Sequence, residues 1–130
     1  MLTRKTKQKE FVIENLKKRF DHPTALQIYN DAKDQKIGIG EVSIYRILNN
    51  LVKEGAVCKI VTKDNVAHYD FVRENHIHLV CNNCNQIFDK EFGSDEKLSK
   101  IIKDFHISIQ DIVLYGCCND CAKTLKKTDK

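Results

Sequence analysis

The chain has 130 residues, 42% of them hydrophobic and 31% charged, and a formal net charge of +4 at pH 7. This length suits one domain, or two very small ones whose cores would need a metal ion or a partner chain. It contains no run of ~18 apolar residues that could span a membrane, and no apolar run near the N-terminus resembles a signal peptide. We therefore expect a cytoplasmic protein without a membrane partner, in a compartment where paired cysteines more often bind metal than form disulfides.

The positive charge is concentrated in the first half of the chain. Residues 1–60 carry 12 Lys and Arg against 7 Asp and Glu, a balance of +5, whereas residues 61–130 carry 10 against 11, a balance of −1. A basic half favours a polyanionic partner such as DNA. From charge alone, a lysine-rich helix face that meets only solvent is the alternative.

Three helices and a β-hairpin are predicted in the first half. Apolar residues at helical spacing and two β-rich runs around a polar turn predict helices 7–19, 24–36 and 41–54 and strands 56–61 and 66–72. Thr24 is a suitable N-cap for the second helix, and Gly55 a suitable C′ residue for the third. This order predicts a winged helix-turn-helix domain over residues 1–72, whose third helix would enter the major groove.

The second half reads as a small α/β domain over residues 76–130, after a short polar hinge at 73–75. The elements predicted for it are strands 78–80, 86–88, 107–109 and 112–115 and a helix 95–105. Ser94 is expected to cap that helix, and the charged tail 123–130 is expected to fray. The predicted fold class is therefore α+β.

Two CxxC pairs offer four sulfur ligands, namely Cys81, Cys84, Cys118 and Cys121. Zinc binds four thiolates tetrahedrally, and each CxxC turn can place two sulfurs on one ion. Since the protein would fill every position, we expect one structural Zn²⁺ per chain. The alternatives are ordinary buried cysteines or a redox dithiol, although a thioredoxin-type motif has a single CxxC at a strand-to-helix junction. Cys58 and Cys117 are expected to be small buried hydrophobes or exposed thiols.

A second group combines histidines with acids. His76 and His78 are two apart in an extended segment, so they share a face and can share a metal. Asp70, Asp89 and His22 lie elsewhere in the sequence, and each alone could be a solvated strand end or a helix cap. Together, three imidazoles and two carboxylates would form a mixed nitrogen and oxygen shell that suits Fe²⁺ or Mn²⁺.

Five motifs spread over nearly the whole chain form a specific pattern. They are His22-Pro23-Thr24-Ala25, Val42-Ser43-Ile44-Tyr45-Arg46-Ile47-Leu48, Tyr69-Asp70-Phe71, His76-x-His78-x-x-Cys81-x-x-Cys84 and Tyr115-Gly116-x-Cys118-x-x-Cys121. This pattern resembles the ferric uptake regulator family of bacterial metal-dependent repressors. The resemblance implies a homodimeric repressor, not an enzyme, which binds a double-stranded DNA operator and dimerises through residues 76–130.

The resemblance also implies a regulatory site with one Fe²⁺ or Mn²⁺ per chain, held by His22, Asp70, His76, His78 and Asp89. Aspartate at positions 70 and 89 is similar to the peroxide-sensing branch, in which bound Fe²⁺ reacts with hydrogen peroxide and a ligand histidine is oxidised. The residues oxidised would be His22 or His76. An iron-responsive repressor is the alternative, which differs only in the signal that it senses; iron sensors typically carry glutamate at both positions. A zinc enzyme is a more remote alternative, since a closed Cys₄ shell leaves no open position.

DNA contacts are expected from the third helix and from basic residues around it. Tyr45 and Arg46 are predicted to reach the groove, Arg46 because its planar fork can pair with guanine or a phosphate. The full predicted set is Ser43, Tyr45, Arg46, Lys5, Lys7, Lys9 and, on the turn of the hairpin, Lys63. Packing of Tyr45 into the helix's core face is the alternative.

Overall fold

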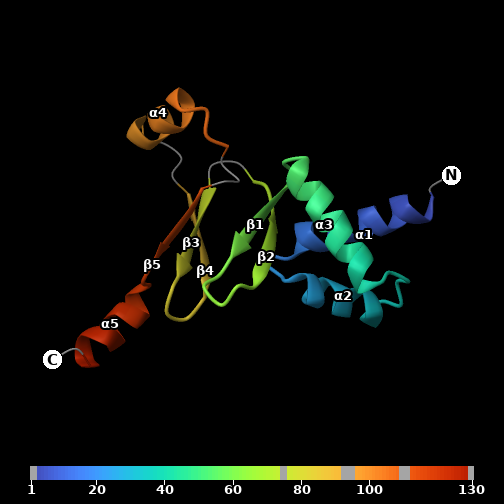
Figure 1. Cartoon of the computed structure of the whole chain (residues 1–130), viewed down its shortest axis with the longest axis horizontal. Helices are drawn as coiled ribbons and strands as arrows, with labels where there is room; N and C mark the ends of the chain where they lie inside the picture. Colours follow the sequence, from blue (N-terminus) through green and yellow to red (C-terminus); the bar gives the residue numbers. More distant parts are fainter. Residues whose placement is uncertain (1–2, 74–75, 92–95, 109–111, 129–130) are drawn as a thin grey trace. The chain divides into compact units, whose positions relative to one another are not determined.

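The structure, a computed structural model, describes residues 3–73, 76–91, 96–108 and 112–128. It consists of two compact units (Figure 1). Unit 1 comprises Met1–Ile60 and Val66–Val72, and unit 2 comprises Val61–Asn65 and Arg73–Lys130. The predicted α+β class is confirmed. None of the helices in the described ranges has the length and apolar character needed to cross a bilayer.

Unit 1 has the element order expected of a winged helix-turn-helix. Its elements are α1 (Arg4–Lys18), α2 (Ala25–Asp34), α3 (Glu41–Lys53), β1 (Val57–Val61) and β2 (Ala67–Phe71), the two strands forming a hairpin sheet. Each helix contributes one apolar face to a single core, which also includes a valine of β1 and a tyrosine of β2. The buried core residues are Val12, Leu16, Ala25, Ile28, Ala32, Ile39, Ile44, Ile47, Leu48, Leu51, Val57 and Tyr69.

The helix ends of unit 1 follow their local sequence. Thr24 and Gln27 form a reciprocal capping box: the backbone N–H of Gln27 donates to Thr24 Oγ1 at 3.2 Å, and that of Thr24 donates to Gln27 Oε1 at 2.9 Å. Gly55 follows α3 with φ 79°, as a C′ glycine should. Helix α1 begins at Arg4 rather than residue 7, because Thr3 accepts a hydrogen bond from the backbone of Thr6 and caps it.

The segment before α2 is not a simple break, because it is attached to β2. The backbone N–H of Tyr69 donates to the carbonyl of Pro23 at 2.9 Å, and Thr24 forms an isolated antiparallel bridge with His68. These bonds place His22, which directly precedes Pro23, beside the strand that carries Asp70.

Unit 2 is built on a three-stranded sheet with β3 (His76–Cys81) in the centre. Strand β4 (Ile87–Glu91) pairs with it antiparallel and β5 (Val113–Gly116) pairs with it parallel. In this register His78 lies opposite Asp89, whereas Leu79 lies opposite both Phe88 and Leu114. The sheet therefore has a face with imidazoles and acid and an opposite face that is apolar.

Two predictions for unit 2 are wrong and one lies outside the described residues. Ile107 and Ser108 form no strand, because the N–H of Ile107 donates to the carbonyl of Ile102 and ends α4 (Glu96–Asp104); residue 109 lies beyond the described ranges. The tail expected to fray forms α5 (Asn119–Thr128), since the second CxxC starts a helix with Asp120 in its favourable first turn. The predicted cap Ser94 is not among the described residues.

We predict that Thr24→Ala destabilises unit 1 by about 1 kcal/mol, because it removes the side-chain oxygen of the capping box. Urea unfolding followed by circular dichroism would measure the loss. Thr24→Ser, which keeps the hydroxyl, is the matched control and should stay close to the parent chain. Equal stability of the alanine variant and the parent would contradict the role of the cap.

Candidate metal centres

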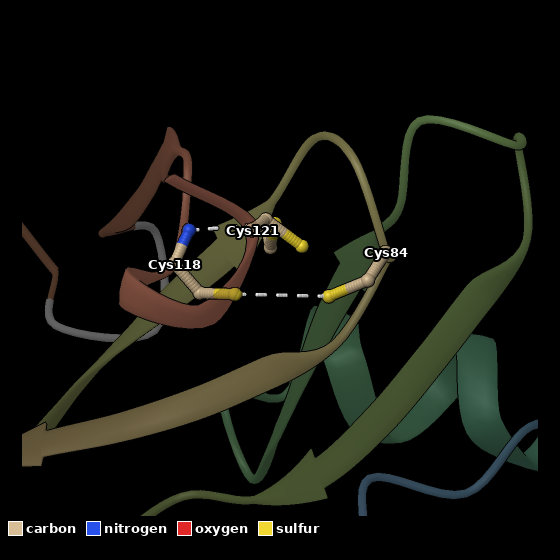
Figure 2. A group of neighbouring side chains, drawn as sticks. Cys84, Cys118 and Cys121 are labelled. Carbon is tan, nitrogen blue, oxygen red and sulfur yellow. Dashed lines mark hydrogen bonds between the residues drawn. The ribbon is translucent and has the colours of Figure 1, made fainter. Parts of the chain in front are cut away.

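The four CxxC cysteines meet in unit 2, and their spacing fits a tetrahedral metal. The sulfurs of Cys81, Cys84, Cys118 and Cys121 all lie within 4.8 Å of one another. Figure 2 shows the sulfurs of Cys84 and Cys118 facing each other. The distance between these two atoms is 4.0 Å. Zinc–sulfur bonds of about 2.3 Å put the sulfurs of a tetrahedral site about 3.8 Å apart. The four residues therefore fit zinc with little movement.

Parallel pairing of β3 with β5 brings the two CxxC pairs together. Cys81 ends β3 opposite Gly116, which ends β5, and the N–H of Asn82 donates to the carbonyl of Gly116 at 2.8 Å. Because both strands end at the same side of the sheet, the turn after Cys81 and the segment after Gly116 lie next to each other. The second pair differs from the turn we expected: Cys121 lies in the first turn of α5.

Backbone N–H groups that donate to Cys81 favour its thiolate, the form that binds a metal cation. The N–H of Cys118 donates to Cys81 Sγ at 3.4 Å, and together with the N–H of Cys84 it lowers the pKa of Cys81 to about 6. Hydrogen bonding to Asn83 lowers the pKa of Cys121, but bonding to Cys118 and burial raise it by more, to about 12. Neighbouring thiolates repel one another, so full ionisation needs a positive ion such as Zn²⁺.

The two remaining cysteines have different surroundings. Cys58 is buried on β1 and behaves as a small core residue, whereas Cys117 is exposed beside the cluster. Cys58 is therefore the small buried hydrophobe and Cys117 the exposed thiol of the two alternatives that we expected.

Unit 1 contributes one histidine and one acid of the second group. His22 Nε2 lies 3.7 Å from Asp70 Oδ2, and both side chains are buried. His22 has φ 55°, in the left-handed region that non-glycine residues seldom adopt. Sequence reasoning missed a neighbour of this pair: His68 Nδ1 lies 2.8 Å from the carbonyl oxygen of His22. The sequence did contain one signal: His68 lies two residues before Asp70 on a predicted strand, so the two side chains share a face.

Unit 2 contributes the other three predicted ligands, all on the same face of the sheet. His78 Nε2 lies 3.3 Å from Asp89 Oδ1 across the β3–β4 pairing. The ring of His76 stands edge-on to that of His78, with centroids 4.9 Å apart. His76 Nδ1 donates to the carbonyl of Arg73 at 3.0 Å, which leaves Nε2 as the ligand atom and is typical of metal-binding histidines.

The predicted DNA contacts lie mostly on the surface of unit 1. Arg46 is exposed on α3, and Tyr45 is 44% exposed, so this tyrosine is not a core residue. Lys5, Lys7 and Lys63 are also exposed, and Ser43 is half-buried. Lys9 differs from the other lysines, because its Nζ lies 3.3 Å from Glu54 Oε1 and its charge is partly neutralised. Val42, 81% exposed on the first turn of α3, is a surface residue that we did not anticipate.

The chain is similar to known regulators over nearly its full length. Residues 2–115 match the model of the ferric uptake regulator family. A curated relative, the peroxide operon regulator of Bacillus subtilis, is 30% identical over 121 residues, covering 91% of this chain and 83% of the relative.

Solved structures give the same result for the fold. The peroxide stress regulator of Campylobacter jejuni superposes with a TM-score of 0.70 at 30% identity, covering 90% of each chain. The ferric uptake regulator of Helicobacter pylori, described as having three functional metal-binding sites, gives 0.67 at 25% identity, covering 89% of this chain and 80% of that one.

We predict that Cys118→Ser abolishes stoichiometric zinc binding, because it removes one of four converging sulfurs. Cys117→Ser is the matched control: it changes the adjacent exposed cysteine and should leave zinc content unchanged. Atomic absorption on the purified variants would measure zinc per chain. Zinc lost from both variants, or from neither, would contradict the assigned ligands.

Proposed function

The chain belongs to the ferric uptake regulator family, and on this premise we propose that it is a peroxide-responsive, metal-dependent repressor. We propose further that it is a regulator rather than an enzyme and acts in the cytoplasm as a homodimer on double-stranded operator DNA. The peroxide regulators at 30% identity support the branch. The structural role of zinc in this proposal rests on the four converging cysteines, which leave no open ligand position.

The observation that carries the proposal is the division of the regulatory ligands between the two units. Of the five predicted ligands, all of which the structure describes, unit 1 holds His22 and Asp70, 3.7 Å apart. Unit 2 offers His76, His78 and Asp89. Two ligands are too few for Fe²⁺ or Mn²⁺, which favour higher coordination by nitrogen and oxygen. We therefore propose that both sets ligate one ion per chain.

Ligands on two units would link metal binding to DNA binding. When His22 and Asp70 share an ion with the residues of unit 2, the orientation of α3 becomes restricted relative to the unit that dimerises. An operator with two half-sites accepts only certain spacings of two recognition helices. Metal and operator would then increase each other's affinity by the same factor.

Unit 2 has the surface that a homodimer needs. The apolar face of its sheet leaves Phe88 40% and Leu114 53% exposed. Ile101 on α4 is 58% exposed, and Phe105, which directly follows α4, is 79% exposed. Exposed apolar side chains in this number on a small unit indicate a protein interface. A second copy of the chain would cover them and would bring two copies of α3 to one operator.

Unit 1 has the charge that an operator needs. Arg46 and Tyr45 are presented by α3 for the groove, while Lys5 and Lys7 are exposed for phosphate contacts. Lys63, on the turn of the hairpin that is grouped with unit 2, is exposed as well. Each phosphate neutralised releases counterions, so operator affinity should fall steeply with salt.

The peroxide response would depend on the imidazole ligands. Bound Fe²⁺ supplies the redox chemistry by which hydrogen peroxide oxidises a neighbouring side chain. His22 and His76 are the residues that we expect to be oxidised, one on each unit. An oxidised ring no longer offers the same ligand nitrogen, so the link between the units and the affinity for the operator would be lost.

We predict that His22→Ala weakens metal-dependent operator binding by about 10-fold or more, because unit 1 then keeps one ligand. Fluorescence anisotropy with a DNA fragment selected from a random pool, with and without Mn²⁺, would measure it. Zinc content should not change, since all four cysteines of the two CxxC pairs lie in unit 2. Loss of zinc from this variant would refute the assignment of two separate sites.

We predict that Asp89→Glu suppresses inactivation by peroxide while metal-dependent repression persists. The longer side chain keeps the charge but moves the carboxylate relative to His78, which lies opposite it on β3. Operator binding after treatment with Fe²⁺ and then peroxide, with mass spectrometry of the His22 and His76 peptides, would test this. Unchanged sensitivity to peroxide would instead favour an iron-responsive repressor.

A further inference from the structure

His22 has a backbone conformation that its surroundings must maintain. Its φ of 55° lies in the left-handed region, which is unfavourable for a residue with a Cβ. Such conformations persist where neighbouring structure holds them. In unit 1 that structure is β2: His68 Nδ1 lies 2.8 Å from the carbonyl oxygen of His22, and the N–H of Tyr69 donates to the carbonyl of Pro23.

The chemistry of the partners determines the direction of the bond from His68. A carbonyl oxygen only accepts hydrogen bonds, so Nδ1 of His68 must carry the hydrogen. The bond therefore restrains the backbone of His22.

The same strand contacts His22 at two points. His68 and Asp70 are two residues apart in β2, so their side chains lie on the same face of the hairpin. His68 reaches the backbone of His22, while the Asp70 carboxylate lies 3.7 Å from its ring nitrogen Nε2. A backbone held at His22 therefore limits the positions that its imidazole can take relative to the carboxylate.

We propose that His68 is a positioning residue for the regulatory metal, although not itself a ligand. Its Nδ1–H holds the backbone of His22, so that the ligand atoms of His22 and Asp70 stay together in unit 1 before any ion binds. This inference rests on the proposed function, which assigns both residues as ligands. Outer-shell partners commonly bind the ring of a ligand histidine. Here the bond goes to the backbone, which is the strained part.

The test compares three substitutions in the full-length, zinc-loaded protein. Asparagine places its amide nitrogen where Nδ1 of histidine lies and can still donate, glutamine carries it one atom further, and leucine has no donor. We expect His68→Leu and His68→Gln to weaken Mn²⁺ binding by about 10-fold, as outer-shell changes commonly do. His68→Asn should keep most of the affinity. Competition with a fluorescent chelator would measure Mn²⁺ affinity directly, without DNA.

A double-mutant cycle separates positioning from a general effect on folding. In the His22→Ala background, His68→Leu should cause no further loss of Mn²⁺ affinity, because the residue that it positions is no longer a ligand. Thermal unfolding of the regulatory-metal-free variants, recorded in parallel, identifies loss due to instability. If His68→Leu does not fold, the comparison of His68→Asn with His68→Gln decides the question.

Three results would overturn the proposal. They are unchanged Mn²⁺ affinity in His68→Leu, equal losses in the asparagine and leucine variants, and the same loss with and without His22. Unchanged Mn²⁺ affinity in His22→Ala alone would refute the ligand assignment of the proposed function, and the role of His68 with it.

Discussion

The pairing of β3 with both of its neighbours is the constraint on which both candidate metal centres depend. Its antiparallel pairing with β4 places His78 opposite Asp89, and its parallel pairing with β5 brings the segment that contains Cys118 to the end where Cys81 lies. A single six-residue strand thus carries one predicted zinc ligand, Cys81, at one end and the predicted regulatory ligands His76 and His78 towards the other. A shift of one residue would turn every side chain to the opposite face and disrupt both sets.

Because the two centres share this strand, zinc binding would also support the regulatory ligands of unit 2. Unit 2 buries few apolar residues, since α4 buries none and much of one sheet face is exposed. Small domains with so little core usually need a metal ion or a partner chain. A zinc ion on the four cysteines would hold β3 and β5 in register, and a second copy of the chain would cover the apolar face. His76 and His78 would then lie on a strand whose position is stabilised both by the zinc ion and by the second copy of the chain.

Unit 1 holds its proposed ligands, His22 and Asp70, by different means, because its helices and hairpin share a buried apolar core. The capping box of α2 and the bonds from His68 and Tyr69 restrain three consecutive residues, His22 to Thr24. The proposed regulatory ion could therefore bind and dissociate without unfolding α1, α2 or α3. This independence suits a regulator, in which the metal site must gain and lose its ion while the DNA-binding helix α3 stays folded.

The sequence by itself determined most of the elements and the kinds of metal ligand, because these depend on local pattern and residue type. Apolar spacing, Thr24 and Gly55 predicted α2 and α3 closely, and two CxxC pairs sufficed to predict the zinc ligands. Local pattern failed for α5, whose helix starts at the second CxxC rather than at an apolar run, and for Ile107, which ends a helix. Only the tertiary structure decided that His68 holds the backbone of His22, since 46 residues separate them. That contact arises from a strand bridge, which sequence spacing does not encode.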